Sequence, residues 1–202
     1  MKKTLLLVLG VALLAGGTMT SCKKGANDPF MSFKSRKGRL SGDWALTAKD
    51  DSETGSFAGV SYTVTTTHDG AIETETTTSS GISNTVTTNE AIALTINKDG
   101  TYTMTATYDN SSTTDSGNWT FLSKNKNGEL KKKEAVVFTS TSQSTTSGGT
   151  TTTTSNTGFN SGGIMILDQL KSKEAIFMGT ITDTDASGDV TTNNYKHTYT
   201  KQ

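Results

Sequence analysis

From Trp44 onward, apolar and polar residues alternate along the chain in short runs. In the stretch TYTMTATY, Thr101 to Tyr108, every second residue is aromatic or apolar and the others are threonines. A period of two is that of a β-strand with one buried and one solvated face. The same alternation at Ile92 to Ile96 and at Tyr195 to Tyr199 predicts strands there. Continuous apolar runs predict more deeply buried strands at 136–138, 164–167 and 176–178.

Turn signals separate these runs at close intervals. Four dipeptides supply the positive φ of tight hairpins: Asp69-Gly70, Asp99-Gly100, Asn127-Gly128 and Gly148-Gly149. Such short connections predict antiparallel neighbours and leave no room for crossover helices. We expect an all-β domain over residues 40–202, an antiparallel meander of about eight to ten strands. It closes as a barrel or stays open as a sandwich, and closure would remove exposed edges.

Two segments depart from simple alternation. Asp168 to Ser172 (DQLKS) is expected to make one helical turn. Thr139 to Gly163 is a low-complexity run of Ser, Thr and Gly in a chain with 41 threonines among its 202 residues. Such a composition fits a flexible loop, but Thr favours strands. We predict a long polar hairpin there, frayed at its tip.

The first 21 residues have the pattern of a helical signal peptide. Lys2 and Lys3 precede the apolar run from Leu5 to Ala15, which is too short to span a bilayer. The sequence Met19-Thr20-Ser21-Cys22 then resembles the lipobox of bacterial lipoproteins. This resemblance implies that Cys22 is acylated, becomes the mature amino terminus and makes the membrane a partner. The alternative is an ordinary secretory peptide followed by a free cysteine.

The charge of the chain is uneven. Residues 22–39 form a basic tether, and residues 22–40 carry six Lys or Arg against Asp28, a net charge of +5. The remaining 162 residues carry 11 basic and 18 acidic side chains, a net charge of −7. Lys23 and Lys24 follow Cys22 where lipoproteins kept in the inner membrane have Asp, so we expect the outer membrane, with its periplasmic face favoured over the cell surface. No global basic excess points to a nucleic-acid partner.

Several motifs of the β domain resemble one family. LSGDWAL, with Gly42 and Trp44, resembles the G-x-W start of lipocalin-like domains. INKDGTYTMT, SGNWTF and ILDQLKSKEAIFMG follow in the order found in lipocalin-like lipoproteins of the Bacteroidetes type. The resemblance implies a lipocalin-like barrel with Trp44 packed across its floor. The central polar insertions depart from compact lipocalins and put an enclosed calyx in doubt.

No catalytic motif is present, so we expect neither enzymatic activity nor a cofactor. His68 lies in THDG, a predicted turn, and is expected at the surface; His197 is expected to be packed or at a rim. Glu73 and Glu75 share one strand face and are expected on a solvated hairpin.

The segment DTDASGD resembles the opening of a calcium loop, with possible ligands at Asp183, Asp185 and Ser187. The twelfth position, where such loops have a bidentate Glu, is Asn194. A hairpin turn needs the same residue types, so we expect no metal.

Two functional classes remain open. In the first, the barrel binds a small apolar ligand in a cavity lined by aromatic and apolar residues of the central strands: Tyr102, Met104, Tyr108, Trp119 and Phe121. In the second, those residues fill a solid core, and the domain is a structural or protein-interaction module of the envelope. A connected apolar cavity of several hundred Å³ would favour the first class. A solid core with extended hairpins would favour the second.

Overall fold

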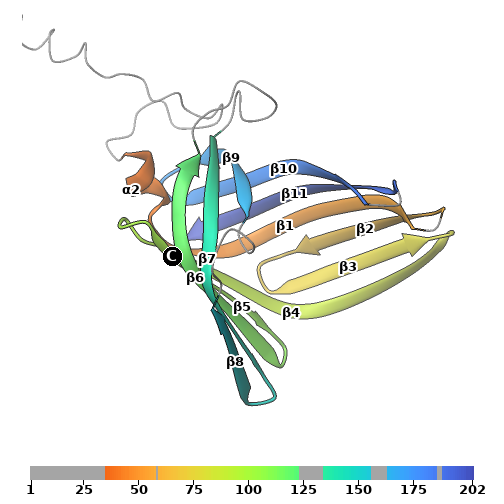
Figure 1. Ribbon diagram of the computed structural model, residues 1–202, viewed down its shortest axis with the longest axis horizontal. Coiled ribbons are helices and arrows are strands. Elements are labelled where there is room, and N and C mark those ends of the chain that lie inside the picture. Colours follow the sequence, from red (N-terminus) through yellow and green to blue (C-terminus); the bar gives the residue numbers. More distant parts are fainter. Residues whose placement is uncertain (1–34, 58, 123–133, 156–162, 186–187) are drawn as a thin grey trace, which may run out of the picture.

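The computed structural model describes residues 35–57, 59–122, 134–155, 163–185 and 188–202. One short helix precedes eleven strands in this part of the chain (Figure 1). Their bounds are α2 Arg36–Leu40, β1 Gly42–Phe57, β2 Val60–His68, β3 Ile72–Ser79, β4 Ile82–Ile96, β5 Thr101–Tyr108, β6 Ser111–Leu122, β7 Glu134–Ser147, β8 Thr150–Ser155, β9 Ile164–Leu170, β10 Glu174–Thr184 and β11 Val190–Lys201.

All strands belong to one antiparallel sheet that closes into a barrel. The order is β6-β5-β4-β3-β2-β1-β11-β10-β9-β7-β8, and a pairing of β6 with β7 closes a ring of ten strands. The predicted all-β meander is therefore confirmed, and the closed barrel is the arrangement found. Three of the four predicted turn dipeptides connect consecutive strands, and Gly70 and Gly100 have φ of 100° and 102°. Asn127-Gly128 lies outside the described residues.

The barrel is narrower at one end. There β1 pairs directly with β4, through Gly42↔Ile96 to Ala45↔Ala93. Further along, the β2–β3 hairpin lies between β1 and β4, and its turn at Asp69-Gly70 lies at the fork. A ring of eight strands at the closed end thus widens to ten.

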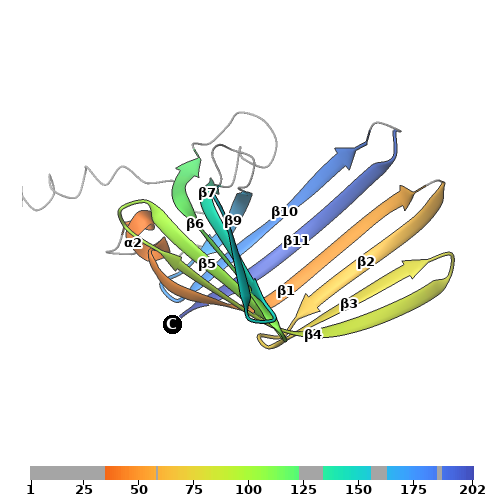
Figure 2. The same cartoon turned by 60° about the horizontal axis from the view of Figure 1, so that its bottom comes forward.

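The opposite end is split. β7 pairs with β9 over residues 134–137 and with β8 over residues 142–147, so the two strands occupy successive parts of one edge. β10 pairs with β9 only over residues 175–177. Figure 2 shows the consequence: β10, β11 and β1 to β4 spread as one broad group, and β5 to β8 diverge from it.

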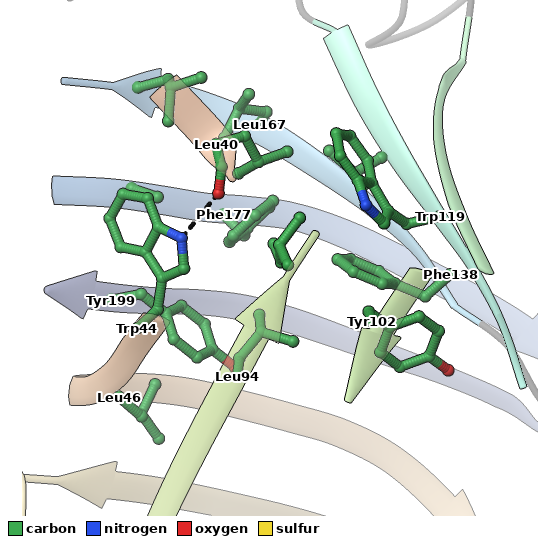
Figure 3. Close-up of a cluster of buried hydrophobic side chains, with 14 residues drawn as sticks. Leu40, Trp44, Leu46, Leu94, Tyr102, Trp119, Phe138, Leu167, Phe177 and Tyr199 are labelled. Carbon is green, nitrogen blue, oxygen red and sulfur yellow. Dashed lines mark hydrogen bonds between the residues drawn. The ribbon is translucent and has the colours of Figure 1, made fainter. Parts of the chain in front are cut away.

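A packed apolar core fills the closed end (Figure 3). The indole of Trp44 is buried, and its Nε1–H donates to the Leu40 carbonyl at 2.7 Å, so α2 covers this end of the barrel. The expectation that Trp44 packs at the floor is confirmed. We call this core the floor; its buried members are Leu40, Trp44, Leu46, Leu94, Ile96, Tyr102, Trp119, Val136, Phe138, Leu167, Leu170, Ala175, Phe177 and Tyr199.

Two local predictions are wrong. Asp168 lies within strand β9 and makes no helical turn, because Leu167 and Leu170 pair with β10 and are buried. The last part of the predicted basic tether is also folded. Arg39 is buried, with Nη1 donating to the Leu170 carbonyl at 3.0 Å, and Arg36 pairs with Glu134 at 2.6 Å.

Some predictions fall partly or wholly outside the described residues. These are the signal peptide at 1–21, Cys22 and the tether as far as residue 34. The polar hairpin predicted from Thr139 exists as β7 and β8 as far as Ser155, and residues 156–162 lie outside. Within the part of the chain that the structure describes, no helix is long and apolar enough to cross a membrane.

Candidate functional site

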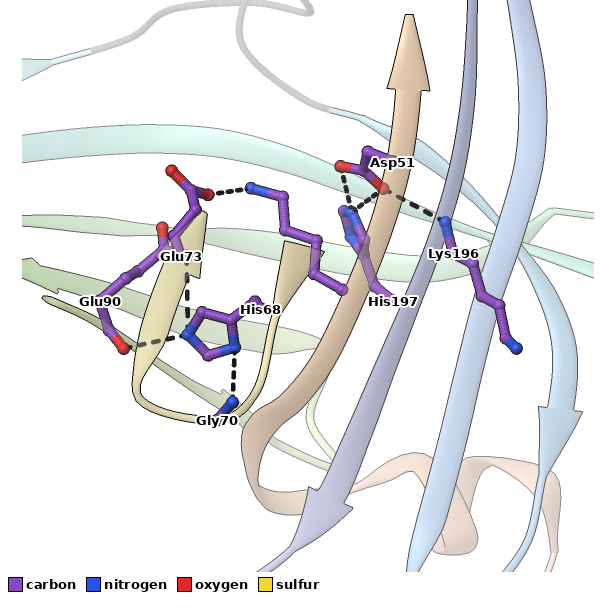
Figure 4. Close-up of polar contacts among 8 residues, drawn as sticks. Asp51, His68, Gly70, Glu73, Glu90, Lys196 and His197 are labelled. Carbon is purple, nitrogen blue, oxygen red and sulfur yellow. Dashed lines mark hydrogen bonds and ion pairs between the residues drawn. The ribbon is translucent and has the colours of Figure 1, made fainter. Parts of the chain in front are cut away.

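Directly above the floor, the barrel interior becomes charged. Cross-strand register places His197, Lys49, His68 and Glu73 side by side on β11, β1, β2 and β3. All four side chains lie on the inner face. Tyr199 of β11 is buried inside the barrel, and because side chains alternate along a strand, His197, two residues earlier, is on the same face. We use the name charged belt for this row and its neighbours on β1 and β4: Lys49, Asp51, His68, Glu73, Glu90 and His197 (Figure 4).

Lys49 and Glu73 form a half-buried ion pair across the fork, through a direct contact between Nζ and Oε2. Burial lowers the pKa of Lys49, but the hydrogen bond and charge of Glu73 outweigh burial, so this pKa lies above its ordinary value of 10.5. Lys49 is therefore a permanent cation that compensates the carboxylates around it. The expectation of a solvated Glu73 is wrong, because the strand pairing brings Lys49 to it; Glu75 is exposed.

His68 is buried, with a side chain that has no exposed surface. Its Nδ1 accepts the Gly70 N–H at 3.0 Å, so the ring proton resides on Nε2, which donates to the Glu90 carbonyl at 3.0 Å. The expected surface position is therefore wrong. Both nitrogens bond to backbone, so His68 ties the β2–β3 turn to β4 and has no free nitrogen for proton transfer.

Glu90 carries the most unusual environment in the charged belt. The residue is 4% exposed, and its Oε2 atom has no hydrogen-bond partner among the described residues, with His68 Nε2 at 3.8 Å. Burial raises the pKa of Glu90, and the nearby Glu73 adds to this rise against the opposing charge of Lys49. Burial and the same two carboxylates also raise the pKa of Tyr108.

His197 lies on the other side of Lys49. Its Nε2 is 3.0 Å from both carboxylate oxygens of Asp51, and its ring lies 5.7 Å from that of Tyr195. His197 is thus a half-buried, packed histidine, as expected. The described residues contain no group of three His, Cys, Asp or Glu side chains arranged to hold a metal ion.

The five predicted cavity residues separate by depth. Tyr102 and Trp119 are buried in the floor, and Met104 and Phe121 pack against it. Tyr102 also donates to Asp115 at 2.5 Å. Only Tyr108 is exposed, beside Glu90 at the level of the charged belt. The gap among the floor residues around Trp44 and Phe177 has no room for a water-sized sphere, so this part of the interior is a solid core.

Beyond the charged belt, the broad strand group has an inner face that is open. We use the name open inner face for the inward-facing positions of β10, β11 and β1 to β4 beyond the charged belt. Register places five aliphatic side chains on this face, each exposed or half-buried: Val60, Val64, Ile82, Val86 and Ile181. Ile82, Ile181 and Val86 are 75%, 57% and 52% exposed.

Three carboxylates accompany these apolar side chains: Glu53, Glu75 and Asp183. Glu53 accepts a hydrogen bond from the Tyr62 hydroxyl at 2.9 Å. Among the described residues, no Lys or Arg occupies an open inner-face position; Lys196 alternates to the outside. This surface was not predicted from the sequence, although Val60, Tyr62 and Val64 alternate with polar residues and so indicate an apolar strand face.

The predicted calcium residues lie at the turn between β10 and β11. Asp183 is the penultimate residue of β10 and is exposed, and its Oδ1 accepts the N–H of Thr184 at 2.9 Å. Asp185 accepts the Asp189 N–H at 2.9 Å, which is a turn-forming bond. Ser187 lies outside the described residues.

Comparison with known proteins adds no relative to this description. No family model matches the chain, and neither curated proteins nor solved structures include a match to it.

Proposed function

We propose that this protein is a non-enzymatic interaction module of the bacterial cell envelope, anchored by acylated Cys22. One observation carries the proposal: the interior is solid at the floor, while the open inner face exposes apolar side chains and carboxylates. Large apolar side chains left exposed on one face of a soluble domain are typical of interaction sites. The charged belt lies between the two regions and supports the fork that widens the barrel.

The position of α2 limits how far the closed end can lie from the membrane. This helix covers the closed end (Figure 1), and it follows Cys22 in sequence by only 14 residues. A chain of that length spans at most about 50 Å. Anchoring at Cys22 would therefore keep α2, and with it the closed end, within about 50 Å of the membrane surface.

Site-specific photo-crosslinking in intact cells tests this function. A photoreactive amino acid at Val64 lies on the open inner face, and one at Thr63 lies on the outer face of the same strand. We expect a protein adduct from position 64 and none from position 63. Equal adducts from both positions, or none from either, would contradict the proposal.

The anchor has its own test. Cys22→Ala is expected to move the protein from the membrane fraction to the soluble fraction of the envelope. Unchanged membrane retention would overturn the lipoprotein assignment. Crosslinking from position 64 does not depend on this result, so the two parts of the proposal fail separately.

A second candidate is binding of a small ligand at the mouth. Its supporting observation is the exposed Tyr108, whose ring lies beside the buried Glu90 at the entrance to the charged belt. Native mass spectrometry of protein purified from its own envelope distinguishes this candidate. A co-purified small molecule that is lost in Tyr108→Ala would support it, and a clean apo mass would exclude it.

A further inference from the structure

We infer that the open inner face binds a cationic amphipathic helix of a partner protein. This inference rests on the proposed function and adds the chemistry of the partner. Strand register defines rows of inward-facing side chains that run across the broad group. One row holds Asp51, Thr66, Glu75 and Val86, and the next holds Ile181, Asn193, Glu53, Val64, Thr77 and Asn84.

These rows interleave apolar and acidic groups at known spacings. Neighbouring strands lie about 4.8 Å apart, and inward residues two apart along a strand are separated by about 7 Å. Glu75 is paired with Val86, and Glu53 is paired with Val64, so each carboxylate has an apolar neighbour on the next strand. The face is thus a mixed surface, on which aliphatic side chains lie beside carboxylates and neutral polar side chains.

The opposite face of the same strands has a different composition. Most of its cross-strand neighbours are hydroxyl pairs, such as Thr76 with Thr85 at 3.0 Å and Thr78 with Ser83 at 2.8 Å. These hydroxyls bond to one another and to water, and no partner is needed to cover them. Two aliphatic side chains, Ile72 and Val190, are also exposed on this face, against four on the inner face. Exposed aliphatic side chains therefore concentrate on the inner side of β2, β4 and β10, where a partner would remove them from water.

The carboxylates decide the sign of the partner's charge. Glu53, Glu75 and Asp183 form no ion pair with any residue that the structure describes. A neutral apolar ligand would remove these carboxylates from water without compensation, which is unfavourable. A partner with Lys or Arg beside its apolar groups would bury the aliphatic side chains and pair with the carboxylates.

The dimensions of the surface favour a helix. Six strands at about 4.8 Å spacing give a width of about 24 Å, the length of a helix of about 16 residues. The β5–β8 group diverges from the broad group (Figure 2), and Ile82, Val86 and Ile181 are more than half exposed, so the inner face is open to solvent. Helix-in-groove binding uses this combination of apolar anchors and flanking charges.

Fluorescence anisotropy tests the inference with a synthetic peptide. The probe is a fluorescein-labelled 16-residue amphipathic helix of Leu and Lys, and the protein is the full chain carrying Cys22→Ser, which lacks the acylation site. We expect saturable binding that weakens as salt increases. A peptide with Glu in place of Lys should not bind, and equal binding of the two peptides would overturn the inference.

Matched variants locate the binding surface. Glu53→Gln with Glu75→Gln should weaken binding at least tenfold, whereas Asp50→Asn, on the outer face of β1, should leave it within twofold. Val86→Thr should weaken binding about fivefold, and Thr87→Ser, on the outer face of β4, should not. Equal losses from inner and outer variants would contradict the assignment.

Other occupants produce different results. Binding of neutral phosphatidylcholine vesicles in place of the peptide, lost on Val86→Thr, would assign the face to lipid and overturn the inference. If the peptide fails to bind but position 64 still crosslinks to a protein in cells, the interaction function stands and the cationic helix is wrong.

Discussion

In the charged belt, individual side chains have lost contact with water and instead contact other protein groups. Glu90 has the fewest compensating contacts, since its Oε2 has no hydrogen-bond donor among the described residues and the cation Lys49 already pairs with Glu73. A buried carboxyl group in this position binds its proton more tightly than it does in the unfolded chain. The charged belt therefore makes stability depend on pH.

The sign of this dependence follows from the raised pKa of Glu90. Between its ordinary value of 4.5 and the higher folded-state value, the folded protein binds more protons than the unfolded chain, so stability falls as pH rises. Glu90→Gln removes the titration, and we expect its stability relative to wild type to increase as pH rises from 4.5. Urea unfolding followed by Trp fluorescence measures the difference.

Glu75→Gln is the control for this experiment, because Glu75 is exposed and lies at the next inward position of β3 after Glu73. Its stability difference from wild type should change little over the same pH range. If Glu90→Gln and wild type instead follow parallel curves, Glu90 does not titrate in the way its burial predicts.

Gly117 is a second residue whose environment is decisive. It lies at the bulge where β6 meets β7, and a Cβ there would overlap the backbone carbonyl of Thr139. We expect Gly117→Ala to reduce the free energy of unfolding by about 1–3 kcal/mol, because two strand backbones must separate. Gly163→Ala is the control, since a Cβ there meets no atom within 4 Å. Equal stability of the two variants would contradict the close approach.

Single residues were the hardest part of the molecule to predict from sequence. His68 follows three threonines and precedes Asp69-Gly70, so local pattern alone places it near a turn. Its burial depends on Glu90, 22 positions away, and on the β2–β3 hairpin lying in the fork. The floor aromatic Trp44 was predictable because it belongs to a motif, whereas the charged belt is assembled from five separate strands.

Among the elements, the hairpins are specified by local sequence. β5 has the bounds of its alternating run, Thr101 to Tyr108. Its apolar face runs from the buried Tyr102 to the exposed Tyr108, and the threonines of its other face are exposed or half-buried. The strand predicted at 164–167 forms the first part of β9, but its last residues, Asp168 to Leu170, were mispredicted as part of a helical turn. DQLKS has no alternation, and the strand state of these residues comes from pairing with β10. The split of β7 between β8 and β9 likewise depends on pairing distant in sequence.

The turn of the β3–β4 hairpin is a position where one substitution is expected to stabilise the fold. Ser80 has φ of 51° and Gly81 has φ of 77°, the signs of a type I′ turn. Asn tolerates this conformation better than Ser, so Ser80→Asn should raise the free energy of unfolding by about 0.5 kcal/mol. Calorimetry measures the shift in Tm, and Ser61→Asn, in strand β2, provides a control that should not gain stability. A loss on Ser80→Asn would exclude this turn.

For the whole molecule, the main feature is the gradient from a packed closed end to a split open end. The floor strands pair on both edges around buried side chains. In contrast, every residue of β8 is exposed, and among the described strands it pairs only with β7. Amide hydrogens exchange through opening reactions whose free energy rises with packing and burial. We therefore expect protection to decrease along single strands, from the floor to the tip.

Strand β4 provides the sharpest form of this prediction, because it runs through both regions. Its residues from Leu94 to Ile96 contact the floor, and those from Ser83 to Thr87 are all exposed. Hydrogen-exchange mass spectrometry should show exchange slower by several orders of magnitude in the first segment than in the second. A partner peptide on the open inner face should protect residues 83–87 selectively, since Asn84 and Val86 lie on that surface and the floor is already closed. Uniform protection along β4 would mean that the split end is as rigid as the floor, and the surface would then be preformed for its partner.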